Sequence, residues 1–156
     1  MEIIDNIDNI DLVLELGSIK PEAIKSFDIL CLPENYGSTD MVDSSGTLDF
    51  YKTLKEEGFS CANSYDLDIN SKVIERRGND IWLGQLFIIN DFVIPGVMAA
   101  LEYFIIKRFS SDTKQLSLTG EPEIHMEIKF NKKGKISKIK FDGSSKDALK
   151  IIKAYQ

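Results

Sequence analysis

Cysteine and histidine are scarce in this chain, and each scarcity excludes a class of protein. Of 156 residues only two are cysteines, Cys31 and Cys61, and they form no C-x-x-C pair. A disulfide scaffold and a structural zinc knuckle are therefore excluded, and we expect both thiols to be buried as small apolar groups. Because His125 is the single histidine, mechanisms and metal sites that need two imidazoles are excluded as well.

Short motifs for nucleotide and ester chemistry are also missing. The sequence contains no G-x-x-x-x-G-K-[ST], no G-x-G-x-x-G and no G-x-S-x-G, which leaves a nucleotide-binding loop and a serine hydrolase without support. We expect no cofactor and no catalytic constellation. The N-terminus is acidic where a secretory signal would be basic, so we expect a cytoplasmic protein.

The composition predicts one globular α+β domain over residues 1–156. Apolar residues make up 43% and aromatic residues 10% of the chain, which is enough material for a core. The net charge of −6 is unevenly distributed, with 17 acids and 7 bases in residues 1–80 but 8 acids and 12 bases in residues 81–156. All basic residues after Arg108 are lysines, whereas nucleic-acid-binding domains are rich in arginine, so we do not expect a nucleic-acid partner.

Residues 1–80 contain several short candidate elements. Patterning predicts strands over 11–16, 27–32 and 59–62, a half-exposed strand over 66–76, and a first helix that begins near Pro21. Residues 33–46 are polar and rich in Gly, Ser and Asp, which predicts a long loop that is mobile or functional. A helix should follow, capped by Thr47 or Asp49 and terminated at Gly58.

Residues 81–109 form the most apolar segment. Between residues 81 and 106 the only ionisable side chains are Asp91 and Glu102. We predict one kinked helix or a pair of helices over 80–89 and 92–109, with Asp91 as the N-cap and Pro95 in the first turn, where its missing N–H is harmless. A helix that is apolar nearly all round must be buried on more than one side. It is therefore a core helix, with or without a face given to a second subunit. A membrane-associated protein that uses 81–106 is a disfavoured alternative.

The C-terminal segment has the clearest pattern. Apolar and polar residues alternate on both sides of a turn at Gly134, which predicts a β-hairpin over 123–142 in a mostly antiparallel sheet. The alternation places Ile128 opposite Ile139 and Glu127 opposite Lys140. A closing helix over 145–155 should follow, capped by Ser144. The hairpin and this helix are expected to pack on the helix within 81–109.

Glu123, His125 and Glu127 share the polar face of the first hairpin strand. An imidazole beside two carboxylates can hold a metal ion or act in acid–base catalysis. The same alternation also produces an ordinary solvated strand face, on which cross-strand ion pairs with Lys138 and Lys140 explain the charges. We favour the ion pairs and keep the metal site as the alternative.

A short segment, Asp43-Ser44-Ser45-Gly46-Thr47-Leu48, resembles two unrelated families. It is similar to the first motif of haloacid-dehalogenase-type phosphatases and to the metal-dependent adhesion site of von Willebrand A domains. Either resemblance would make Asp43 a nucleophile or a metal ligand. Ser45 departs from the second aspartate of the phosphatase motif. We therefore interpret the segment as a polar loop before a helix.

The function that these observations favour is non-enzymatic. We expect a small acidic module that docks a protein partner, forms a homodimer, or does both through the 81–109 helix. A neutralising or accessory protein in a bacterial defence system is one example of such a module. Arg76, Arg77 and Trp82 are the candidate partner-binding residues, since arginine and tryptophan are enriched at binding hot spots. The alternative is a small metal-dependent hydrolase that uses the 33–47 loop or the strand face with Glu123, His125 and Glu127.

Overall fold

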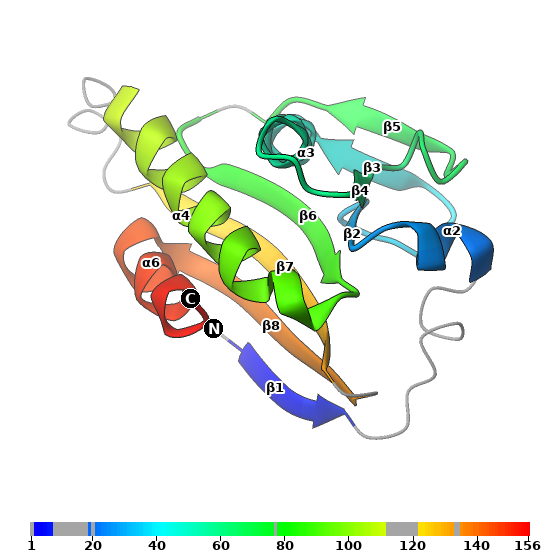
Figure 1. Cartoon of the computed structure of the whole chain (residues 1–156). Coiled ribbons are helices and arrows are strands. Elements are labelled where there is room, and N and C mark those ends of the chain that lie inside the picture. Colours follow the sequence, from blue (N-terminus) through cyan, green and yellow to red (C-terminus); the bar gives the residue numbers. More distant parts are fainter. Residues whose placement is uncertain (1, 8–18, 20, 77, 112–121, 133–134) are drawn as a thin grey trace.

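A six-stranded mixed sheet is the centre of the structure (Figure 1). The computed structural model describes residues 2–7, 19, 21–76, 78–111, 122–132 and 135–156. The strand order is β1-β8-β7-β6-β2-β4, in which β7–β6 and β2–β4 are parallel pairs and the other three pairs are antiparallel. These strands are β1 (Glu2–Ile7), β2 (Ile29–Leu32), β4 (Cys61–Ala62), β6 (Ile81–Ile88), β7 (Glu123–Lys132) and β8 (Lys135–Ser144).

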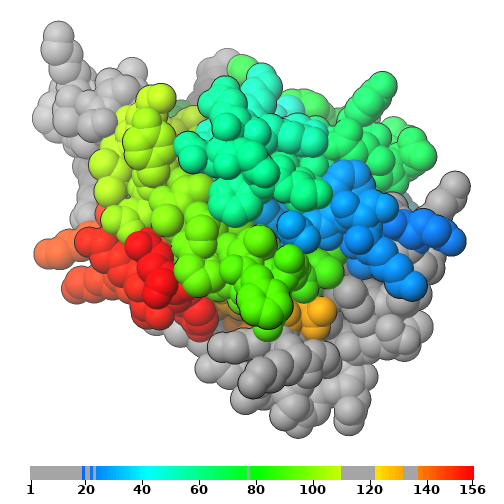
Figure 2. Space-filling model, in the orientation of Figure 1, coloured from blue at the N-terminus to red at the C-terminus, as the bar shows by residue number. Residues whose placement is uncertain are grey.

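Helices cover one face of this sheet, so the predicted α+β class is confirmed. Three of them, α3, α4 and α6, form a layer that Figure 2 shows from its outer side. A two-stranded parallel sheet, β3–β5, lies beside the main one. The remaining elements are α2 (Pro21–Ser26), β3 (Met41–Ser44), α3 (Ser45–Glu56), β5 (Ser71–Ile74), the 3₁₀ turn η1 (Asp91–Val93), α4 (Ile94–Ser111) and α6 (Ser145–Ala154).

The C-terminal hairpin has the predicted register. Ile128 pairs with Ile139 and Glu127 with Lys140. The alternating apolar residues of both strands are buried against the helical layer, and this fixes the register, because a slip of one residue would expose all of them. The closing helix is confirmed too: the N–H of Asp147 donates to Ser144 Oγ at 3.2 Å, as a capping residue requires.

The prediction of a helix over 80–89 is wrong, because residues 81–88 form the strand β6. β6 is a central strand whose end, near Phe87, is covered on both sides. Leu83 and Leu86 face the helical layer, while Phe87 belongs to a second apolar cluster on the other side of the sheet. Strands buried on both faces are apolar almost continuously, so their sequence shows no period of two and is easily taken for a buried helix.

Only the second half of the predicted helix pair is helical. α4 begins at Ile94, with Pro95 in its first turn as expected. The cap lies one residue earlier than predicted: Asn90 Oδ1, and not Asp91, accepts the N–H of Phe92 at 3.1 Å. Among the described residues, no helix combines the length and the apolar content needed to cross a bilayer.

The long loop predicted for 33–46 is interrupted by regular structure. Residues 41–44 are strand β3, which pairs in parallel with β5, and α3 starts directly at Ser45. The half-exposed strand predicted over 66–76 is confined to residues 71–74. Gly58 ends α3 as expected, with a φ of +88° that favours glycine. The strand predicted over 11–16 lies outside the described residues.

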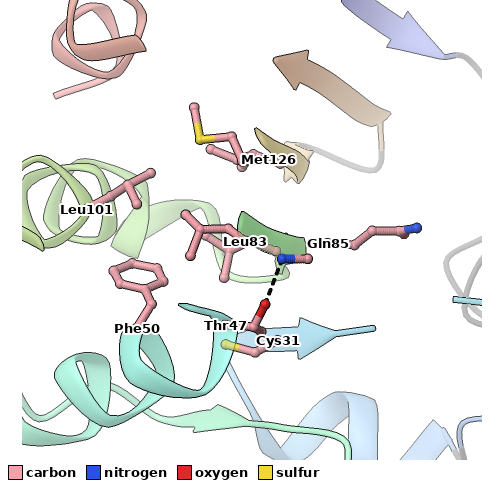
Figure 3. A pocket seen from close by; sticks show the side chains of 10 residues that line it. Cys31, Thr47, Phe50, Leu83, Gln85, Leu101 and Met126 are labelled. Atoms are coloured by element: carbon pink, nitrogen blue, oxygen red, sulfur yellow. Dashed lines mark hydrogen bonds between the residues drawn. The ribbon is translucent and has the colours of Figure 1, made fainter. Parts of the chain in front are cut away.

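The start of α3 is fastened to the middle of β6 (Figure 3). Ser44 Oγ donates to the carbonyl of Trp82 at 2.6 Å, and Thr47 Oγ1 accepts the N–H of Gly84 at 2.7 Å. A bulge between Trp82 and Gln85 takes these β6 groups out of the ladder with β7. The two hydroxyls therefore satisfy backbone groups that would otherwise be buried without partners. A cavity of about 10 Å³ beside this junction has room for one water at most.

Both thiols are free and buried, as the sequence predicts. Burial raises the pKa of Cys31 well above its ordinary value. Burial also raises the pKa of Cys61, to about 11, although Lys55 opposes this rise. Thiols with raised pKa values are mostly protonated at neutral pH and are poor nucleophiles.

Candidate metal centre on the open face of the sheet

The polar side of the hairpin lies on the sheet face opposite α4 and α6. Adjacent strands bring three side chains into one row there, because Trp82 of β6 pairs with His125 of β7, and His125 pairs with Asp142 of β8. Asp80 immediately precedes β6, and Glu123 is the first residue of β7. The pairing thus collects one imidazole, three carboxylates and one indole from three neighbouring strands.

Both ring nitrogens of His125 face carboxylates. Nδ1 lies 2.7 Å from Asp142 Oδ1, and Nε2 lies 3.1 Å from Asp80 Oδ2. Glu123 Oε2 is 3.9 Å from the same Nε2. The side chain of His125 is only 15% exposed, so solvent screens these contacts less than it would on an open surface.

The carboxylate of Asp80 is oriented by the backbone. Its Oδ1 accepts the N–H of Glu123 at 3.0 Å, which leaves Oδ2 directed at His125. This bond ties the residue before β6 to the first residue of β7. The carboxylate of Asp80 and the N–H of Glu123 that orients it thus lie at the starts of two neighbouring strands. The pairing of these strands, from Ile81–Ile124 onward, fixes their relative position.

A stack of three planar groups fixes the orientation of the imidazole. The rings of Trp82 and His125 lie 3.8 Å apart at an interplanar angle of 18°. On the other side of the indole, Arg76 Cζ lies 4.0 Å from the ring centroid. Arg76 is held by two contacts with Glu34, at 2.5 and 3.2 Å. A bidentate arginine–carboxylate pair has a defined geometry, so the stack holds His125 in place.

The carboxylates determine the protonation of His125. Burial lowers the pKa of the imidazole, but hydrogen bonds to Asp142 and Asp80 and the charges of these two residues outweigh this effect. The pKa therefore lies above its ordinary value of 6.5. Without a metal ion, the two carboxylates thus favour the protonated form of His125.

Asp80, Glu123 and His125 can also act together as ligands of one ion. One donor atom from each lies within 4.8 Å of the other two, and no other described His, Cys, Asp or Glu residues form such a group. Two donors bound to one tetrahedral zinc ion at about 2.1 Å are roughly 3.4 Å apart. The separations of His125 Nε2 from Asp80 and from Glu123, 3.1 and 3.9 Å, lie on either side of that value. Small side-chain movements would therefore close the site around an ion.

A pocket of about 160 Å³ opens beside this group on the same face. Its polar lining consists of Glu34, Gln85, His125, Glu127, Lys140 and Asp142. It is large enough for a group the size of one amino-acid side chain.

The residues proposed from the sequence fall in different places. Glu123 and His125 are brought together, whereas Glu127 lies beyond them and pairs with Lys138 at 2.6 Å, not with its register partner Lys140. Asp43 is not a member of this group: it is 3% exposed on β3, and its Oδ2 accepts the hydroxyl of Ser71 at 2.5 Å. The segment from Asp43 to Thr47 thus forms the junction between β3, α3 and β6.

Arg76 and Trp82, which we expected at a partner surface, belong to the same cluster as His125. His125 covers one face of the indole and Arg76 the other, so both faces of the ring are occupied by groups of this chain. Arg77 lies outside the described residues.

Asp80 and Asp142 are members of the cluster that the sequence did not single out. Asp80 is the first residue of the helix predicted over 80–89, and Asp142 is the last residue of the predicted hairpin. Recognition of 81–88 as a strand beside the hairpin would have placed both next to His125.

No known protein family, curated protein or solved structure matches this chain. Its function has to be inferred from the site itself.

Proposed function

We propose that this protein is a binding module that holds a divalent metal ion through His125, Asp80 and Glu123. The observation that carries this proposal is that two of the three ligands are already oriented by other groups. Asp142 holds Nδ1 of His125, and the N–H of Glu123 holds Oδ1 of Asp80. A carboxylate behind a ligating histidine is the common outer-shell arrangement of metal sites, because it fixes the ring and raises its basicity.

The donor set indicates which ions are suitable. One imidazole nitrogen and two carboxylate oxygens fit first-row divalent ions such as Zn²⁺ and Mn²⁺. Ca²⁺ and Mg²⁺ take oxygen ligands almost exclusively and should bind more weakly. Three protein donors leave at least one coordination position open. We propose that a donor group from a protein partner occupies it, so that the ion becomes part of the docking surface.

Calorimetric titration of the chelator-treated protein with Zn²⁺ tests the site. We expect one ion per chain and a loss of at least 100-fold in affinity for His125→Gln, because the nitrogen ligand is removed. Asp142→Asn, which alters only the group behind the histidine, should weaken binding about 10- to 100-fold.

Glu127→Gln is the matched control, because Glu127 lies two residues from His125 on the same strand face but pairs with Lys138. Its affinity for Zn²⁺ should equal that of the wild type. Absence of stoichiometric binding, or equal loss in the Glu127→Gln and His125→Gln variants, would show that the cluster is an ion-paired surface only.

A metal-dependent hydrolase is the second candidate, and the neighbouring pocket of about 160 Å³ is the observation that favours it. An ion with an open position lowers the pKa of bound water and so supplies a nucleophile. Zn²⁺-dependent hydrolysis of p-nitrophenyl acetate or p-nitrophenyl phosphate, lost in His125→Gln, would support the enzyme over the docking role. Stoichiometric zinc without turnover would support the docking role.

A further inference from the structure

An apolar stripe runs along the outer face of α4 and the turn before it. Phe92, Tyr103 and Ile106 are 90%, 56% and 48% exposed. The exposed residues between them on this face are Pro95, Gly96 and Ala99. Only two other large apolar side chains in the described part of the chain, Tyr65 and Val73, are comparably exposed. Figure 2 looks onto the helical layer that carries this stripe, with α4 between α3 and α6.

The positions of the stripe have the spacing of a helix–helix seam. Residues 92, 95, 99, 103 and 106 follow one another at intervals of three or four, so they lie on one side of the helix. The opposite side of α4 is occupied by the core, where Val97, Met98, Leu101 and Ile105 are fully buried. The stripe is therefore a second apolar face that the fold does not use.

The sizes of the side chains are complementary to a reversed copy of the same stripe. If two α4 helices pack antiparallel about a two-fold axis at Ala99, positions at equal distances from residue 99 face each other. Phe92 then meets Ile106, and the ring of Tyr103 lies over Pro95 and its neighbour Gly96. Tyr103 thus meets small residues, Phe92 and Ile106 form an apolar pair of large side chains, and Ala99 permits close approach at the axis.

The charges beside the stripe favour the same arrangement. Under this symmetry Asp91 faces Lys107 of the second copy, and the pair occurs twice. Lys107 lies next to the stripe, with Nζ 5.7 Å from the ring centroid of Tyr103. In a parallel pair, by contrast, Asp91 would face Asp91 and Lys107 would face Lys107, which costs binding energy.

We propose that a second copy of this chain covers the stripe and that the two α4 helices pack antiparallel about Ala99. A two-fold interface requires one self-complementary patch, and the stripe is complementary to itself in both size and charge. The contact is centred on one helix face, at the small end of specific interfaces, so we expect reversible dimers. This inference is independent of the metal site, which lies on the other face of the sheet.

Sedimentation equilibrium over a range of protein concentrations tests the dimer. The wild type should pass from monomer to dimer as concentration rises. Ala99→Arg places two like charges at the axis and should raise the dissociation constant at least roughly 100-fold. Tyr65→Arg, which changes an 88% exposed residue outside the stripe, is the control and should leave the dissociation constant unchanged. A wild type that stays monomeric, or Ala99→Arg dimers as stable as the wild type, would overturn the proposal.

Charge exchange tests the direction of the helices. Asp91→Lys and Lys107→Asp should each weaken the dimer, by roughly three- to tenfold, because each creates two like-charged contacts. The double variant exchanges the partners and should restore the dimer. In a parallel pair each residue faces its own copy, so either single substitution would leave the dissociation constant unchanged. That result would overturn the antiparallel arrangement.

Discussion

The two faces of the central strands carry different kinds of side chain, although residues that alternate along the same strands supply both faces. On β8, Phe141 is 2% exposed beneath the helical layer, while its neighbour Lys140 points to the open face. On β7, Met126 and His125 are divided in the same way. The covered face holds the fold together by apolar burial, and the open face is left to carry titratable groups. The difference teaches that neighbouring residues on one strand have different roles: one stabilises the fold by apolar burial, and the next supplies a titratable group on the open face.

The largest loss of stability should come from removing a buried side chain on the covered face. Phe141→Ala removes a buried ring and leaves a cavity, so we expect a loss of about 3–5 kcal/mol in the free energy of unfolding. Lys140→Ala, one residue away on the open face, should change it by no more than about 0.5 kcal/mol. Urea denaturation of both variants measures the contrast. Similar losses in the two variants would mean that the faces do not divide the energy in this way.

A smaller effect is expected where α3 is fastened to β6 on the covered side. Thr47→Val keeps the shape of the side chain but leaves the N–H of Gly84 without its acceptor, which should cost about 1–3 kcal/mol. Thr53→Val on the same helix removes only an exposed bond to the carbonyl of Asp49 and serves as the control. Equal stabilities of the two variants in urea would argue against a structural role for the junction.

On the open face, pH should act through His125. The folded-state pKa of this residue is raised, so its proton binds more tightly in the folded protein than in the unfolded chain. This stabilisation is complete below the unfolded-state pKa near 6.5 and is lost as the pH rises through the folded-state value.

Urea midpoints measured across this pH range, with a chelator present, should therefore fall with rising pH for the wild type relative to His125→Gln. Trp82, the only tryptophan, stacks on the imidazole and provides an independent fluorescence reading of the same titration. Parallel pH profiles for the wild type and the variant would refute the contribution of His125 protonation to the stability of the fold.

The smallest expected effect belongs to the ion pair between Glu127 and Lys138. The side chains are 16% and 28% exposed and their charged atoms lie 2.6 Å apart. Partly exposed cross-strand pairs contribute about 0.2–1 kcal/mol and weaken with salt. A double-mutant cycle with Glu127→Gln and Lys138→Met, repeated at low and high salt, should give a coupling in that range that shrinks with salt. A larger coupling that salt does not affect would show that the open face also contributes to folding.

The sequence was sufficient where local pattern and tertiary burial agree. The alternation in 123–142 predicted both the hairpin and its register, because one face of each strand is buried and the other is wet. Ser144 and the apolar spacing after it predicted the last helix for the same reason.

The sequence did not predict secondary structure correctly where tertiary packing determines it. Residues 81–88 are apolar almost throughout and carry a bulge, so no alternation identifies them as a strand. β3 depends on pairing with β5, which lies 30 residues later in register. The candidate site shared this limit. Glu123 and His125 are near neighbours in sequence, whereas Asp80 reaches them only through the parallel pairing of β6 with β7.

The junction between α3 and β6 also provides a way to identify relatives of this chain. A methyl group at Gly46 would lie 2.3 Å from the carbonyl oxygen of Trp82, and one at Gly84 would lie 2.4 Å from that of Leu32. Backbone atoms cannot move aside as a flexible side chain can, so any protein that keeps this crossing needs glycine at both positions. The two glycines, together with the hydroxyls of Ser44 and Thr47, form a sequence fingerprint that evolution should retain even where every surface residue, including the proposed metal ligands, has changed.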